Sequence, residues 1–120
     1  MIAPDEVPSL VKKHAARFSA LIDEYVEDLG DAVNYPMLGH VIGTLLHEWR
    51  TEANTTAALC DLQQLVDLAE ECLRDGDDSV HDLFALEVVE PLLQPENTSV
   101  LRLLRMGPAT MAEMERARNA

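Results

Sequence analysis

The chain has 120 residues, with 22 acidic against 9 basic side chains, a formal net charge of −13 and a pI near 4.4. This length predicts one domain, and the charge disfavours binding to nucleic acid or to anionic membrane surfaces, because both repel an acidic protein. It favours a basic protein partner, although an acidity that only keeps a protein dispersed explains the same numbers.

The first predicted helix runs from about Val7 to Leu29. Its apolar residues recur at three- and four-residue steps, namely Val7, Leu10, Val11, Phe18, Leu21, Ile22, Tyr25, Val26 and Leu29. Carboxylates crowd its C-terminal end, where they oppose the helix macrodipole: Asp23, Glu24, Glu27, Asp28 and Asp31. Broken local rules sometimes mark function, so these five are the first candidate partner-binding residues. A well-solvated face is the alternative.

A turn at Asn34–Pro36 precedes the second predicted helix, with Pro36 near its first position. Gly39 and Gly43 stand four residues apart, a spacing that lets another helix approach closely. The helix ends in a group of four candidate residues: His47, Glu48, Trp49 and Arg50. Tryptophan and arginine are enriched at binding hot spots, so this group is the second candidate partner-binding site. The alternative is an anchor at the edge of the core.

A third helix is predicted from a cap at Asn54–Thr56 to about Asp75. Gly76 then ends it, with a left-handed conformation expected. The candidates for capping the next helix are Asp77, Asp78 and Ser79. The apolar side chains from Val80 to Leu93 point nearly all round a helix axis. A helix of that kind is typically buried among other helices.

Glu87 and Glu90 interrupt that apolar coat on one side. Inside a buried helix, each carboxylate requires a partner or takes a raised pKa. Pairing with Arg102 or Arg105 is the structural interpretation. An acid–base or ligand-binding role in a pocket is the alternative.

Beyond Pro91 the pattern predicts a short helix over residues 99–106 and a last segment over residues 111–118. The sequence therefore predicts an all-α fold, a compact bundle of about five helices in a single helical domain over residues 1–120. The central buried helix is expected near residues 79–93, and the last ten or so residues are expected to fray.

No catalytic, cofactor or metal signature is present in the sequence. The histidines form neither a His-Glu-x-x-His motif nor the paired Glu-x-x-His of di-iron bundles, and there is no Gly-x-Ser-x-Gly elbow. Cys60 and Cys72 are predicted to be small core residues, too far apart on one helix for a disulfide. No apolar run reaches the length of a membrane span, and no signal-peptide pattern is present. We therefore expect a cytoplasmic protein with no enzymatic activity, cofactor or metal.

Three stretches carry a family resemblance: Tyr35-Pro36-Met37-Leu38-Gly39, Gly76-Asp77-Asp78-Ser79-Val80 and Leu86-Glu87-Val88-Val89-Glu90-Pro91-Leu92-Leu93. The chain resembles, over roughly residues 7–106, a group of small, acidic, all-helical bacterial proteins of an uncharacterised domain type, similar to the immunity proteins of polymorphic toxin systems. The resemblance implies binding to a basic surface or active-site cleft of a cognate toxin, and it brings no catalytic motif. The alternatives are a helical regulatory adaptor, or a small enzyme or ligand-binding domain that uses Glu87 and Glu90.

Overall fold

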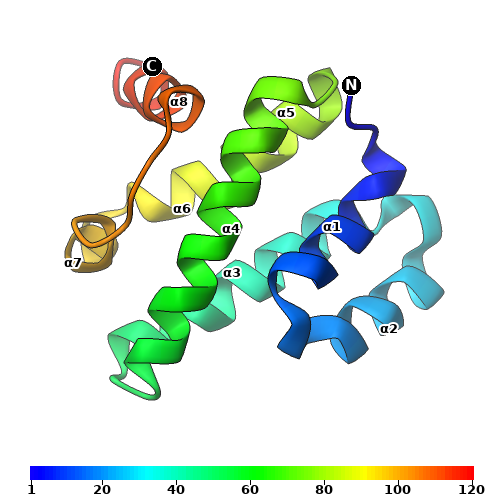
Figure 1. The fold of residues 1–120 in the computed structure, drawn as a ribbon, viewed down its shortest axis with the longest axis horizontal. Coiled ribbons are helices and arrows are strands. Elements are labelled where there is room, and N and C mark those ends of the chain that lie inside the picture. Colours follow the sequence, from blue (N-terminus) through cyan, green and yellow to red (C-terminus); the bar gives the residue numbers. More distant parts are fainter.

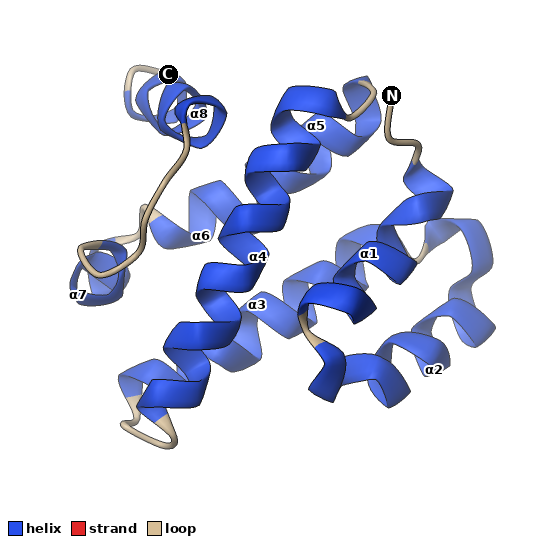
Figure 2. Ribbon diagram, viewed as in Figure 1, coloured by secondary structure: helices blue, strands red, loops and turns tan.

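The computed structural model describes all residues from Met1 to Ala120 and contains helices but no sheet (Figures 1 and 2). Its helices are α1 (Val7–His14), α2 (Ser19–Leu29), α3 (Asn34–Arg50), α4 (Thr55–Asp75), α5 (Asp78–Phe84), α6 (Glu90–Leu92), α7 (Thr98–Leu101) and α8 (Pro108–Arg118). A π-helical turn, η4 (Ala85–Val89), joins α5 to α6 into one continuous segment. The all-α prediction is confirmed, but the number of helices exceeds the predicted five. No helix combines the length and the apolar composition needed to cross a membrane.

The longest helix, α4, is the centre of the fold. Figure 1 shows it crossing the molecule between α1 and α2 on one side and α7 and α8 on the other. Its bounds agree with the predicted third helix, because the apolar spacing is a local signal. The predicted side-chain cap at its start is absent, since Asn54 has a left-handed backbone (φ 60°, ψ 47°) and makes no capping hydrogen bond. It buries eight residues against its neighbours: Ala58, Leu62, Leu65, Val66, Leu68, Ala69, Cys72 and Leu73. The organising helix is therefore α4 and not the segment near residues 79–93.

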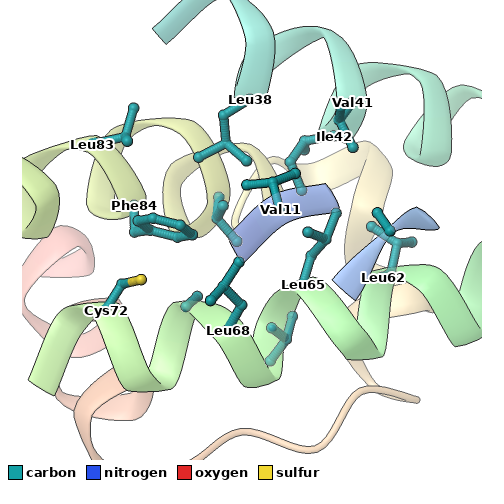
Figure 3. Packing of buried hydrophobic residues seen from close by; sticks show 14 of the residues in the cluster. Val11, Leu38, Val41, Ile42, Leu62, Leu65, Leu68, Cys72, Leu83 and Phe84 are labelled. Atoms are coloured by element: carbon teal, nitrogen blue, oxygen red, sulfur yellow. The ribbon is translucent and has the colours of Figure 1, made fainter. Parts of the chain in front are cut away.

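Side chains from α1, α3, α4 and α5 meet in one hydrophobic cluster of 28 buried residues. Figure 3 shows Val11 of α1, Leu38 of α3, Leu65 and Leu68 of α4, and Phe84 of α5 directed toward one another. All five are fully buried. Burying a side chain of this size contributes about 1.5–3 kcal/mol relative to leaving it exposed, so the cluster is the main source of stability.

The segment from α5 to α6 is buried on one side only, which corrects the expectation of a helix buried all round. Its buried residues are Val80, Leu83, Phe84, Val88, Val89 and Leu92. On the opposite side Asp82 and Glu90 are exposed, and Leu86 retains 49% of its accessible surface. The π turn accounts for the difference, since its extra residue rotates Val88 and Val89 toward the core that Leu83 and Phe84 already face.

The first predicted helix is in fact two helices, separated at Ala15, whose backbone leaves the helical region at φ −136° and ψ 65°. No proline or glycine marks this break. The short 3-10 turn Ala16–Phe18 follows, and its Arg17 binds residues of two other helices. Its Nε donates to Oδ2 of Asp61 in α4 at 2.7 Å, and its Nη1 donates to Oε2 of Glu48 in α3 at 3.1 Å. Contacts with distant elements therefore position α2.

Gly76 separates α4 from α5, but its conformation is extended (φ −77°, ψ 157°) and not left-handed as expected. Glycine is required here by close packing, because an added Cβ would lie 2.4 Å from the carbonyl oxygen of Cys72. Asp77 caps α5, since its Oδ1 accepts the amide of Val80 at 2.9 Å. The predicted stop and start of helices at this position is confirmed.

The C-terminal residues expected to fray form α8, which packs on α4. Glu70 of α4 accepts the amides of Ala109 and Thr110 at 3.1 and 2.8 Å, so a carboxylate from another helix caps α8. Gly107 leaves room for this contact, because a Cβ there would lie 2.4 Å from Cδ of Glu70. The capping group is 39 residues away from Ala109 in the sequence.

Candidate partner-binding surfaces

The first candidate surface, the acidic face of α2, is exposed to solvent along its length. We define it as the five residues predicted from the sequence: Asp23, Glu24, Glu27 and Asp28 on α2, and Asp31 on the following 3-10 turn Gly30–Ala32. Asp23 and Glu27 are four residues apart, as are Glu24 and Asp28, so like charges face one another on the helix. Glu27, Asp28 and Asp31 therefore place negative charge at the end of α2 where the macrodipole is also negative.

Only one carboxylate of the acidic face has a cationic partner. Lys12 of α1 lies with its Nζ 2.7 Å from Oδ1 of Asp23. Glu24, Glu27, Asp28 and Asp31 form no ion pair with any residue of the chain. Four neighbouring negative charges are thus left for solvent or for another molecule.

Exposed apolar surface lies beside these charges, and the sequence analysis did not predict it. Val26 and Leu29 belong to the apolar positions of the first predicted helix, yet each retains 41% of its accessible surface. A shallow hollow of about 440 Å³ lies at this end of α2, lined by Pro4, Asp5, Pro8, Val26, Gly30, Asp31, Val33 and Asn34. Gly30 shapes it by ending α2 with a positive φ of 53°. The residues around Val26 and Leu29 do not indicate that these two side chains are exposed, because their exposure follows from the break at Ala15.

The second candidate surface, His47–Arg50, is mainly a junction between helices. Trp49 donates from Nε1 to Oγ of Ser99 at 3.1 Å, and Arg50 donates from Nη1 to Oδ1 of the buried Asn97 at 3.0 Å. Glu48 binds Arg17, whose hydrogen bond holds the pKa of that carboxyl below its ordinary value. Only His47 is both exposed and free of such contacts, so most of this group holds α3 to its neighbours.

The Asp31 end of the acidic face and the His47–Arg50 group lie at opposite ends of α3. The acidic face ends beside the first turn of α3, at Asn34, whereas His47–Arg50 form its last turn. A 17-residue helix separates its ends by about 24 Å. Glu27, Asp28 and Asp31 are therefore not part of one compact site with His47–Arg50.

Glu87 and Glu90, the residues of the enzyme alternative, lie in different environments. Glu87 is half-buried on the π turn beside α3, where a Cβ added at Gly39 would meet its Oε2 at 2.8 Å. Burial, together with the charge of Glu90, raises the pKa of Glu87. Glu90 is exposed, and neither carboxylate pairs with Arg102 or Arg105, so the predicted ion pairs are absent.

Gly39 and Gly43, predicted to let a helix approach α3, differ in their surroundings. Gly39 has the side chain of Glu87 against it, whereas a Cβ at Gly43 would have no atom within 4 Å. Only Gly39 is therefore required by packing. On the same helix, Nδ1 of His40 lies 2.8 Å from the hydroxyl of Tyr25, which ties α3 to α2.

The two cysteines also differ. Cys72 is buried in α4, and burial raises the pKa of its thiol to about 12. Cys60 is exposed, which corrects the prediction that both are core residues. No three His, Cys, Asp or Glu side chains are grouped so that they could hold a metal ion.

The sequence matches no protein-family model and no curated protein, and the fold matches no solved structure. The resemblance to immunity proteins therefore stays a hypothesis. Surface charge and geometry are the remaining basis for assigning a function.

Proposed function

We propose that the chain is a non-enzymatic binding protein of the immunity type, which neutralises a cognate bacterial toxin by covering a basic surface or active-site cleft. The observation that carries this proposal is the acidic face of α2, where four of five exposed carboxylates have no cation on the chain. The exposed Val26 and Leu29 beside them supply apolar surface next to the charges. An apolar centre with a charged rim is the usual anatomy of a protein interface.

The acidic face has a cost in stability. Like charges four residues apart destabilise a helix by roughly 0.2–0.5 kcal/mol per pair. Negative charge in the last turn costs a further few tenths of a kcal/mol, because it opposes the macrodipole. The packing of Ile22, Leu21 and Tyr25 against the core holds α2 in place, and the five carboxylates of the acidic face add nothing to that packing. A local conflict of this kind is expected where residues serve binding and not folding.

The charge also gives the association a measurable signature. A surface of one sign attracts a basic partner over several ångströms and raises the rate of association, and dissolved salt screens this attraction. Binding should therefore weaken as ionic strength rises, mainly through a slower association rate.

The test uses the product of the gene adjacent to that of this chain. Co-expression should rescue cells from its toxicity, and the two purified proteins should form a complex whose affinity falls with added salt. The variant Glu24→Gln, Glu27→Gln and Asp28→Asn should bind about tenfold or more weakly at low salt. It should also unfold at a higher temperature than the parent, because the repulsion within α2 is gone.

The matched control removes the same number of charges elsewhere. Asp82→Asn, Glu96→Gln and Glu115→Gln are exposed positions outside the acidic face, and their substitution should leave affinity nearly unchanged. If both triple variants lost affinity equally, the loss would come from the change in net charge and not from the acidic face itself. Absence of a complex, or a complex indifferent to salt, would remove the basis of the proposal.

Glu87 favours a second candidate, a small enzyme or ligand-binding domain, because burial raises its pKa and a protonated carboxyl can act as a general acid. In that case Glu87→Gln should abolish an activity or the binding of a ligand while the fold persists. A change in stability without any loss of activity assigns the residue to structure.

A further inference from the structure

A groove lined by methionine and leucine lies on the other side of the molecule, between α7 and α8. Its residues are Leu101, Leu104, Met106, Met111, Met114 and Arg118, and its volume is about 310 Å³. Leu104 and Met114 are buried, whereas Met111 at the rim retains 60% of its accessible surface. Figure 1 shows α7, the connection after it and α8 on the side of α4 opposite α1 and α2.

The groove has the chemistry of a protein-binding surface. Methionine side chains are flexible and polarizable, so they adapt to an incoming apolar group. With Met111 more than half exposed, the groove is too open to enclose a small molecule, because ligand pockets usually cover most of the ligand's surface. A segment of another protein can instead lie along α8, whose 11 residues extend about 16 Å, or three helical turns.

The chain segment that forms the groove carries side-chain charge opposite in sign to that of the whole chain. Residues 100–120 contain four arginines against two glutamates, although the protein carries a net charge of −13. Arg118 lines the groove, and Arg102 and Arg105 lie on the exposed turn after α7. None of these three forms an ion pair within the chain. Arginine is suited to bind carboxylates, since its guanidinium presents paired donors.

We infer that this groove binds an acidic amphipathic helix of a partner protein, with the apolar face of that helix on Met111 and Met114 and its carboxylates on Arg118 and the neighbouring arginines. Charge complementarity selects this occupant, because a basic segment would be repelled by the same arginines. The helices α7 and α8, between which the groove lies, are on the opposite side of α4 from α2 (Figure 1), so the groove and the acidic face are separate surfaces that take partners of opposite charge.

The test uses a synthetic helical peptide of about 14 residues as a probe, with leucine at the i, i+3, i+4 and i+7 positions and glutamate elsewhere. A second peptide carries lysine in place of every glutamate. The full chain is labelled with ¹³C on its methionine methyl groups. Its five methionines place three reporters in the groove (Met106, Met111 and Met114) and two outside it, the buried Met37 and the exposed Met1.

The glutamate peptide should shift the methyl signals of the three groove methionines and leave those of Met1 and Met37 in place. Met111→Glu and Arg118→Glu should each weaken binding by about tenfold or more, as expected for central contacts. Leu86→Glu is the matched control, because Leu86 is an exposed apolar residue beside the other flank of α8. Its substitution should leave the affinity unchanged.

Four results would overturn the inference: no binding of the glutamate peptide, equal binding of the lysine peptide, signals that shift only outside the groove, or full affinity in Met111→Glu. Self-association of the chain that Met111→Glu abolishes would also overturn it, because the groove would then belong to a second copy. Circular dichroism and the unfolding temperature establish that each variant is folded.

Discussion

Two partly buried carboxylates, Glu70 and Glu87, respond to their surroundings in opposite ways. Burial raises the pKa of Glu70, but the hydrogen bonds from Thr110 and Ala109 outweigh it and leave the pKa below the ordinary value of 4.5. Glu87 accepts no hydrogen bond from the chain, so burial and the charge of Glu90 raise its pKa above 4.5. Whether the pKa of each carboxyl is lowered or raised therefore depends on the number of hydrogen bonds that it accepts, and the direction of that shift sets how the group changes stability with pH.

Glu70→Ala should destabilise the protein by about 1–2 kcal/mol, because the first amides of α8 lose their acceptor. Since the folded-state pKa of Glu70 is lowered, its ionised form contributes stability above pH 4.5, and this contribution is lost as the pH falls through the folded-state pKa. The free energies of unfolding of Glu70→Gln and the parent, measured by urea titration, should therefore converge at acidic pH.

Gly107→Ala should destabilise the protein by about as much as Glu70→Ala, since the added Cβ displaces the Glu70 carboxylate. Additive effects in the double variant would argue against this shared contact.

Glu87→Gln should raise stability at neutral pH. With its folded-state pKa raised, Glu87 contributes its stability below pH 4.5, and this is lost as the pH rises through the folded-state pKa. The gain of the glutamine variant over the parent should thus grow from pH 4 to pH 7 in denaturant titrations. The exposed Glu115→Gln serves as the control and should show no such trend. A gain that is constant with pH would indicate a packing effect.

The two cysteines should react with a thiol reagent at very different rates. Cys60 is exposed, whereas Cys72 is buried with a thiol pKa of about 12, so it holds almost no thiolate at neutral pH. One thiol per chain should be modified in the native protein at pH 8, and both should be modified in denaturant. Mass spectrometry of the modified peptides identifies the site. Rapid modification of Cys72 in the native state would show that α4 opens locally.

At the level of elements, the break between α1 and α2 decides which surface the chain presents. An uninterrupted helix over residues 7–29 would keep Val26 and Leu29 on the same face as Val7 and Val11. The break at Ala15 reorients α2 and leaves both residues partly exposed beside the acidic face. Arg17, in the turn between the helices, is the main polar contact that joins this turn to α3 and α4.

Arg17→Met should destabilise the protein by about 1 kcal/mol or more, because it removes two ion pairs and leaves Glu48 and Asp61 near each other without a cation. Hydrogen exchange should rise mainly in residues 15–19. Lys12→Met is the control, since Lys12 makes a single exposed pair with Asp23 and should cost no more than about 0.5 kcal/mol. Equal effects of the two substitutions would mean that Arg17 is an ordinary surface ion pair.

Over the whole molecule, charge is distributed unevenly. Helix α2, which carries the acidic face, lies on one side of α4, and the segment from α7 to α8, which contains four arginines, lies on the other (Figure 1). The net charge of −13 nevertheless dominates at long range, and the chain forms few ion pairs whose local attraction opposes the repulsion. The folded state therefore experiences net self-repulsion.

Added salt should consequently stabilise the protein. The molecule measures 35 × 32 × 20 Å, comparable with the Debye length of about 30 Å at 0.01 M salt, so the excess negative charges repel one another across the whole molecule at low ionic strength. Raising NaCl from roughly 0.01 to 0.3 M should raise the unfolding temperature by several degrees, and less so in the triple variant of α2. A fall in the unfolding temperature would mean that attractive ion pairs dominate over repulsion.

The amino-acid sequence alone was sufficient for the features that depend on neighbouring residues. The all-α class and the bounds of α4 follow from apolar spacing, and the cap at Asp77 follows from a carboxylate placed three residues before the amide that it accepts. The five carboxylates of the acidic face were also identified there, because a charge cluster against the helix dipole is visible in the chain itself.

Tertiary structure decided the features that depend on distant partners. Arg17 and Asp61, which position α2, are 44 residues apart, and Glu70 caps a helix that begins 38 residues later. The π turn likewise allows Leu83, Phe84, Val88 and Val89 to reach one core. The spacing of apolar residues in a regular α-helix does not predict such a turn. The contacts of Arg17 with Asp61 and of Glu70 with Ala109 join helices that are distant in the sequence, so no short window of sequence contains both partners.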